Sequence, residues 1–208
     1  MIPPVYPILD MASLIARNVS VMDAADAFIE AGAGILQFRH KGFWDRDSFA
    51  EAEQVAALCR DAGAQFVVND RADYAALLNA GLHIGQDDLT PADARRVIGP
   101  AALLGYSTHN PEQMRLAASE PVDYVAFGPV FPTASKERPD PSVGIEGLRA
   151  ARAMTRKPLV AIGGITRENA SICWAAGADS VAIIADLLPV SCTKRTLRDR
   201  MILWQQLK

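Results

Sequence analysis

Eight short apolar runs recur along the chain, roughly 20–30 residues apart and rich in β-branched and aromatic residues. Each run is too short for a helix, and most are continuous rather than alternating between apolar and polar positions. Continuous runs of this length are typical of strands in a parallel sheet that is covered by helices. The predicted strands are Val5–Leu9, Ile35–Arg39, Gln65–Val68, Leu82–Ile84, Ala102–Tyr106, Tyr124–Val130, Leu159–Ile162 and Val181–Ile184.

The segments between these runs have the apolar spacing of amphipathic helices. Ser20 followed by Asp23 is typical of a capped helix start, and Gly63, Gly81 and Gly177 each stand just after a predicted helix. Glycine is common at such stops because it adopts a left-handed backbone without strain. The predicted helices are Ser20–Glu30, Asp47–Ala62, Arg71–Asn79, Pro91–Ile98, Pro111–Ala118, Gly144–Met154, Arg167–Ala176 and Thr193–Leu207.

Eight strand–helix pairs in 208 residues favour a (β/α)8 TIM barrel, an α/β fold, near its lower size limit. No Pro-, Gly- or Ser-rich linker divides the chain, so we expect one barrel domain over residues 1–208. A doubly wound open sheet also alternates strands with helices and is the rival architecture. The count of eight and the polar residues at the strand ends favour the barrel.

Composition and charge narrow the range of functions. Half of the residues are hydrophobic, 22% are charged and the formal net charge is -3. These values exclude a disordered chain and argue against a nucleic-acid-binding surface. We find no signal peptide and no run of ~20 apolar residues, and the three cysteines lack disulfide or zinc spacing. We therefore expect a cytoplasmic protein without nucleic-acid or membrane partners, and the sequence leaves open a homo-oligomer.

Polar clusters follow nearly every predicted strand, where the loops of a (β/α)8 barrel build the active site. Hydrogen-bond donors and positive charge come from Gln37, Arg39, Lys41 and Lys136. Asp70 and Asp88 add carboxylates after two adjacent strands. Cations together with two carboxylates suit a polyphosphate that shares a Mg²⁺ ion with the protein, because Mg²⁺ is usually held by one or two carboxylates, substrate phosphates and water.

Gly163 and Gly164 follow the seventh predicted strand. Glycines allow a phosphate to approach the backbone, and the amides that open the next helix point toward it. A phosphate site after strands 7 and 8 is common in this fold. Taken alone, the pair is a plain turn about as often as a phosphate cradle.

These strand ends resemble those of the thiamine phosphate synthase family over roughly residues 5–190. The resemblance lies in QFRHK at 37–41, NDR at 69–71, HIGQDDL at 83–89 and GYSTH at 105–109. It continues in DYV at 123–125, GPVFPTASK at 128–136, AIGGI at 161–165 and GAD at 177–179. The GPVFPTASK segment is the most specific of these, whereas GG and GAD occur in many phosphate-binding barrels.

The resemblance implies a transferase that uses Mg²⁺ and two small-molecule substrates. A pyrimidine diphosphate would lose pyrophosphate, and the ring nitrogen of a thiazole phosphate would bond to its methylene, giving thiamine phosphate. The resemblance implies that Asp70 and Asp88 are the Mg²⁺ ligands. The residues that it implies for catalysis are Arg39, Lys41, Ser107 and Lys136. The residues implied to bind the pyrimidine diphosphate are Gln37, Arg39, Lys41, Asn69, Ser107 and Lys136. Those implied for the thiazole phosphate are Thr133, Ser135, Gly164, Ile184 and Ala185.

Three positions depart from the family pattern. His40 stands where Glu is usual, and Ser135 replaces a more usual Thr while keeping a hydroxyl. Ala185 stands where a Ser usually helps to hold the thiazole phosphate. Losing one hydroxyl contact weakens binding by about 1 kcal/mol, so we retain Ile184 and Ala185 as backbone contacts.

Each candidate also has a purely structural interpretation. Asp70 and Asp88 would serve as helix caps, Arg39 and Lys41 as a solvated strand edge, and His83 as a histidine of the barrel interior. The loop 134–143 is either a surface loop or a lid that brings Lys136 over the diphosphate and excludes water.

Two other functions stay open at this stage. One is a thiazole tautomerase of the same family, in which a histidine at the position of His109 is catalytic and Mg²⁺ has no part. The other is a non-catalytic paralogue that binds thiazole phosphate or thiamine phosphate, for which Ala185 is the only indication. The combination of Asp70, Asp88 and Lys136 favours the synthase, because a tautomerase has no use for it.

Overall fold

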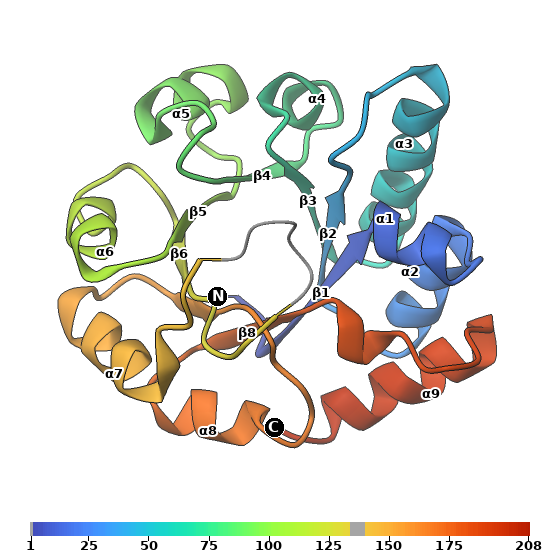
Figure 1. Cartoon of the computed structure of the whole chain (residues 1–208). Coiled ribbons are helices and arrows are strands. Elements are labelled where there is room, and N and C mark those ends of the chain that lie inside the picture. Colours follow the sequence, from blue (N-terminus) through green and yellow to red (C-terminus); the bar gives the residue numbers. More distant parts are fainter. Residues whose placement is uncertain (1, 134–139) are drawn as a thin grey trace.

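The computed structural model describes residues 2–133 and 140–208. Their eight strands are all parallel and close into a barrel in chain order, with helices packed around the outside (Figure 1). The strands are β1 Val5–Asp10, β2 Ile35–Arg39, β3 Gln65–Asn69, β4 Gly81–Ile84, β5 Leu104–Thr108, β6 Tyr124–Phe127, β7 Leu159–Ala161 and β8 Ser180–Ile183. Because β1 pairs with both β2 and β8, the predicted barrel is confirmed and the open sheet is excluded.

The helices follow the predicted pattern, with one addition after β1. They are α1 Met11–Ala16, α2 Val21–Glu30, α3 Arg46–Asp61, α4 Ala72–Leu77, α5 Pro91–Ile98, α6 Pro111–Ala117, α7 Gly144–Met154, α8 Ala170–Ala175 and α9 Lys194–Gln205. A short 3₁₀ helix, η1 (Ala185–Leu187), follows β8. The Ser20 hydroxyl accepts from the amide of Asp23, as the sequence predicts for the start of α2.

Three local differences from the predicted elements have physical causes. Helix α1 starts directly after β1 because the Asp10 side chain accepts from the amide of Ser13 and caps it. The sixth strand ends at Phe127, before the cis peptide bond between Gly128 and Pro129. Gly81 is the first residue of β4 rather than a helix stop, and an added Cβ would lie 3.0 Å from the Leu103 carbonyl oxygen.

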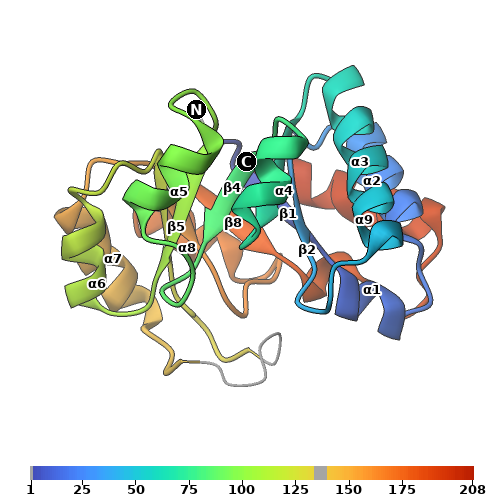
Figure 2. The same ribbon diagram turned by 90° about the horizontal axis from the view of Figure 1, so that it is seen from above.

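Two apolar clusters hold the barrel together. The larger lies between the strands and the surrounding helices, while the smaller gathers inward-facing strand residues. The smaller cluster consists of Ile2, Tyr6, Ile35, Val67, Tyr124, Ala126, Val160 and Ala182. Ile2 precedes β1 and lies near Pro158 and Asp179, at the mouth formed by the strand starts. Figure 2 shows the N-terminus on this side of the sheet and α1, which follows the end of β1, on the other.

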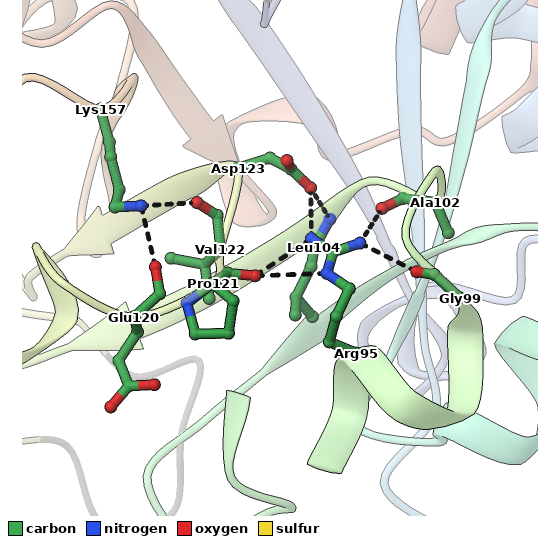
Figure 3. Close-up of polar contacts among 9 residues, drawn as sticks. All are labelled: Arg95, Gly99, Ala102, Leu104, Glu120, Pro121, Val122, Asp123 and Lys157. Carbon is green, nitrogen blue, oxygen red and sulfur yellow. Dashed lines mark hydrogen bonds and ion pairs between the residues drawn. The ribbon is translucent and has the colours of Figure 1, made fainter. Parts of the chain in front are cut away.

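Side-chain carboxylates bind the strand starts at the N-terminal rim. Asp123 accepts from the amide of Leu104 (2.7 Å) and from Arg95 (2.8 Å), which also donates to the carbonyls of nearby loops (Figure 3). Asp179 has the same arrangement two strands later, since it accepts from the amide of Leu159 (2.8 Å) and from Arg152 (2.9 Å). These bonds satisfy strand ends that the parallel ladder leaves open.

None of the helices in the described part of the chain combines the length and apolar character needed to cross a membrane.

Candidate active site

The predicted site residues converge on the C-terminal rim of the barrel. Gln37 and Arg39 lie on β2, Asn69 is the last residue of β3, and Ser107 lies near the end of β5. Asp70 and Asp88 stand in the connections that follow β3 and β4. Lys41 lies two residues beyond β2, and its Nζ is 2.5 Å from Asp70 Oδ2. Among the described residues, the rim therefore brings Lys41 together with the two acids that the sequence assigns to this mouth.

Asp70 is held in an environment that disfavours its charge. Its backbone is in the left-handed region (φ 66°), which non-glycine residues rarely adopt. Burial raises the pKa of its carboxyl, the Lys41 ammonium opposes that shift, and the nearby Asp88 carboxylate raises the pKa further. Strain of this kind persists only where the surroundings enforce it and is frequent at functional sites.

Neither acid caps a helix, so their structural interpretation is wrong. Helix α4 begins after Arg71 without any side-chain cap, and Thr90 caps α5 by accepting from the amide of Asp93. Asp88 instead turns back into its own loop, where its Oδ2 accepts from the amide of Gly85 at 2.7 Å. This bond fixes the Asp88 carboxylate beside that of Asp70.

The Asp70–Asp88 pair suits a divalent cation. The Asp88 carboxylate helps to raise the pKa of Asp70, and Lys41 is the cation that pairs with Asp70. Two neighbouring carboxylates of this kind have a negative charge that a doubly charged ion would offset. No group of three or more His, Cys, Asp or Glu side chains with metal-binding geometry occurs among the described residues. Mg²⁺ held by two carboxylates commonly completes its coordination with substrate oxygens and water.

Arg39 is fixed by an acid that the sequence analysis missed. Its Nη1 donates to Oδ1 of Asp10, the last residue of β1, and the side chains are only 13% and 4% exposed. The second carboxylate oxygen of Asp10 accepts from the amide and hydroxyl of Ser13. The Asp10 carboxylate thus holds the guanidinium in place. The predicted solvated strand edge is wrong for Arg39.

Asn69 has an unused donor at the rim. Its side chain is 5% exposed, and its Nδ2 has no hydrogen-bond partner among the described residues. Leaving a buried amide donor without a partner costs about 1–3 kcal/mol. Such a group at the end of a barrel strand is typical of a ligand contact.

Gln37 and Ser107 are joined through the interior of the barrel. Their side chains lie at the two ends of a row of hydrogen bonds through Tyr6, Tyr124 and His83. His83 is therefore an interior histidine, as its structural interpretation predicts. Gln86, which the sequence analysis did not single out, donates to the Ser107 carbonyl at 2.6 Å and holds the end of β5.

The connection after β6 packs tightly on the one after β7. The amides of Val130 and Phe131 donate to the carbonyls of Ile162 (2.8 Å) and Gly163 (3.1 Å). A Cβ on Gly164, whose φ is 66°, would lie 2.4 Å from the Pro132 carbonyl oxygen. The glycine pair is thus required by close approach of the two loops, and that approach brings Thr133 and Gly164 to one part of the rim. Ser135 and Lys136, with most of the predicted lid, lie outside the described residues.

His109 is bound to the same β6 connection. Its Nδ1 lies 2.6 Å from the Gly128 carbonyl oxygen and 3.6 Å from the Asp140 carboxylate. Its backbone amide donates to Gln113. The side chain thus supports the loop beside the mouth.

Ile184 and Ala185 lie at the end of β8, where the chain enters η1. Asp186, the next residue, accepts from Trp204 Nε1 of α9 at 2.9 Å and forms ion pairs with Arg167 and Arg200. Ala185 thus brings only its backbone to the rim, and the charged residue beside it anchors the C-terminal helix.

Comparison with known proteins identifies the family. Residues 5–187 match the sequence profile described as "Thiamine monophosphate synthase". The chain belongs to this family. It is 50% identical to the thiamine-phosphate synthase of Koribacter versatilis (strain Ellin345) over 166 residues, which are 79% of this chain and 78% of that protein. It is 40% identical over 191 residues to that of Methanoculleus marisnigri (strain ATCC 35101 / DSM 1498 / JR1), covering 90% of each.

Solved structures agree with this membership of the thiamine monophosphate synthase family. Thiamine phosphate pyrophosphorylase from Pyrococcus furiosus superposes with a TM-score of 0.83 at 28% identity, over 98% of this chain and 94% of that one. A 2-keto-3-deoxy-6-phospho-gluconate aldolase from Zymomonas mobilis ATCC 29191 superposes with a TM-score of 0.70 at 16% identity, over 100% and 94%. The second similarity shows the fold alone.

Proposed function

We propose that this chain is a thiamine-phosphate synthase, a transferase that joins a pyrimidine diphosphate to a thiazole phosphate and releases pyrophosphate. The observation that carries the proposal is the charge cluster at the C-terminal rim, in which Lys41 pairs with Asp70 beside Asp88. The cluster brings positive and negative charges together at one place. The reaction itself is inferred from membership of the family.

The pyrimidine diphosphate is assigned to the mouth between β2 and β5. Arg39 and Lys41 would neutralise the diphosphate, joined by Lys136 from the loop after β6. Asn69 offers its unpaired Nδ2 to the pyrimidine ring, and Gln37 and Ser107 reach the same space from the barrel interior. Asp10 contributes indirectly, because it keeps the Arg39 guanidinium in place.

Mg²⁺ is assigned to Asp70 and Asp88. When bound, it would neutralise the departing pyrophosphate and stabilise the charge that develops on it. The protein's own part is to hold the two carboxylates together, through the bond from the Gly85 amide to Asp88 and the strained backbone of Asp70. Lys41, which pairs with Asp70, would lie close enough to contact the diphosphate.

The thiazole phosphate is assigned to the neighbouring part of the rim, after β6, β7 and β8. Thr133, Ser135 and the backbone of Gly164, Ile184 and Ala185 would hold its phosphate. Packing of the β6 connection onto Gly163 and Gly164 supports this placement, because it brings the two loops within hydrogen-bonding distance. With Ala185 in place of a serine, the phosphate loses one hydroxyl contact.

Catalysis in this arrangement requires no protein nucleophile. Departure of the pyrophosphate leaves positive charge on the pyrimidine methylene, and the thiazole nitrogen then bonds to it. The chain contributes fixed positive charge for the leaving group and alignment of the second substrate, which are the electrostatic and positioning terms of catalysis.

A turnover assay with both substrates and Mg²⁺ tests the proposal. We expect pyrophosphate and thiamine phosphate to appear in equal amounts and only when both substrates and Mg²⁺ are present. Isomerisation of the thiazole phosphate alone, without Mg²⁺, would instead identify a tautomerase. Tight binding of thiazole phosphate with no pyrophosphate release would identify a binding protein.

A further inference from the structure

A row of buried hydrogen bonds crosses the barrel interior from β2 to β5. Gln37 Nε2 donates to the Tyr6 hydroxyl at 3.1 Å, and the hydroxyls of Tyr6 and Tyr124 are 3.0 Å apart. His83 Nδ1 lies 2.9 Å from the Tyr124 hydroxyl, and His83 Nε2 lies 2.8 Å from Ser107 Oγ. These five side chains are at most 9% exposed, so water does not set the direction of their bonds.

The number of hydrogen atoms on these side chains determines which group donates and which accepts in each hydrogen bond of the row. Burial raises the pKa of Tyr6 to about 12 and that of Tyr124 well above its usual value, so each phenol keeps one hydrogen. Since Gln37 donates to Tyr6, and Tyr124 is the other partner of the Tyr6 hydroxyl among the described residues, Tyr6 donates to Tyr124. Tyr124 in turn donates to His83 Nδ1.

A histidine that accepts at Nδ1 carries its hydrogen on Nε2 when neutral. His83 then donates from Nε2 to Ser107 Oγ. The Ser107 hydroxyl, already accepting one bond, is left with its own hydrogen to donate. Ser107 lies at the end of β5 on the C-terminal rim, so that hydrogen is available to a ligand in the mouth.

We propose that Tyr124 and His83 are positioning residues that hold the Ser107 hydroxyl as a donor toward a lone-pair acceptor on the bound pyrimidine diphosphate. The acceptor is a ring nitrogen or a diphosphate oxygen. The identity of the ligand in this inference rests on the proposed function. Which side chain donates in each hydrogen bond of the row does not depend on that function. The row also joins two predicted substrate contacts, Gln37 and Ser107.

The first test reads the histidine tautomer directly in the full chain. Only three histidines are present, so two-bond ¹H–¹⁵N spectra of ¹⁵N-histidine-labelled protein, with His40→Gln and His109→Gln for assignment, resolve His83. We expect the Nε2–H tautomer in the wild type and in Tyr6→Phe, where Tyr124 still donates. Tyr124→Phe removes the donor to Nδ1 and should produce the Nδ1–H form or a mixture. An Nδ1–H or imidazolium form of His83 in the wild type would overturn the proposal.

The second test separates positioning from packing. In His83→Gln the side-chain amide takes the place of Nε2 and still donates to Ser107, whereas His83→Leu keeps the volume and loses the donor. We expect KM for the pyrimidine diphosphate to rise about tenfold in His83→Leu and less than about threefold in His83→Gln, as the loss of one hydrogen bond predicts. Equal KM values for the two variants, with both folded, contradict the proposal.

Ser180→Ala is the matched control, because it removes a buried hydroxyl of β8 that has no partner among the described residues. Its KM should equal that of the wild type. If the wild type itself shows no turnover, the proposed function fails, and the tautomer spectra still decide the direction of the row.

Discussion

Asp10 and Arg39 face each other across β1 and β2 as register partners, and their side chains form an ion pair at the C-terminal ends of the two strands. The pairing places a guanidinium at the mouth and fixes its orientation with a nearly buried carboxylate. Because Asp10 uses its other oxygen for Ser13, the two roles can be separated by mutation.

Asp10→Asn should lower kcat/KM for the pyrimidine diphosphate about tenfold, because the amide has one acceptor oxygen in place of two, so the charge-assisted bond from Arg39 is lost when that oxygen stays with Ser13. The amide oxygen still accepts from Ser13, so α1 keeps its cap. Steady-state kinetics with varied pyrimidine diphosphate checks this. Ser13→Ala, which removes the hydroxyl on the other side of the same carboxylate, should change kcat/KM by less than about twofold. Similar losses in both variants would show that Asp10 acts only through the helix.

Asp88→Asn should cut kcat by at least ~100-fold and raise the Mg²⁺ concentration needed for half-maximal rate, because one of two protein ligands is weakened. Asp87→Asn is the matched control, since it removes the same charge from the exposed neighbouring position, and it should behave like the wild type. A Mg²⁺ titration of the rate measures both.

His109→Ala should be milder, with a loss of no more than about tenfold, because His109 holds the β6 loop through the Gly128 carbonyl. The same turnover assay measures it. An inactive His109→Ala beside an active Asp88→Asn would reverse the assignment in favour of the tautomerase.

Gly164→Ala should destabilise the fold by about 2 kcal/mol more than Gly63→Ala. Both glycines have a left-handed backbone, with φ of 66° and 70°, so the strain of adding a Cβ is similar. Only Gly164 would also place that Cβ 2.4 Å from a carbonyl oxygen, whereas nothing lies within 4 Å of it at Gly63. Overpacking of this kind costs about 1–3 kcal/mol. Urea unfolding of the two variants measures the difference, and equal values would contradict the close approach of the loops.

Alkaline pH should destabilise the wild type more than Tyr6→Phe. The pKa of Tyr6 is about 12 in the folded chain and about 10 in an unfolded one. The unfolded state therefore releases its proton first, and the free energy of unfolding falls as pH rises from 10 toward 12, by about 1.4 kcal/mol per pH unit. Removing the phenol abolishes this contribution, so the stability curves of the two proteins should converge as the pH rises from 10 toward 12. Parallel curves from urea unfolding would contradict it.

Much of the architecture follows from local sequence pattern. Pro91–Ile98 and Gly144–Met154 are helices with the predicted bounds, since Pro opens the first and apolar spacing defines both. The rim residues Lys41, Asp70 and Asp88 could be predicted to meet because all parallel strands end on the same side of a barrel.

The interior row and the Asp10–Arg39 pair could not be predicted in the same way. Tyr6 and Tyr124 lie 118 positions apart, and each fits the apolar pattern of its own strand, so no local signal marks their hydroxyls as partners. Asp10 directly follows the predicted strand Val5–Leu9, and the apolar pattern gives no sign that the strand includes it. Both features depend on closure of the barrel, which sets distant strands against one another.

Asp123 and Asp179 fasten the strand starts at the end of the barrel away from the chemistry. The hydrogen bonds that fix the strand starts and the groups proposed for the chemistry therefore lie at opposite ends of the same strands. Substitutions that add ion pairs around Arg95 and Arg152 can therefore stabilise the strand starts. Such substitutions leave the substrate-binding residues at the strand ends unchanged.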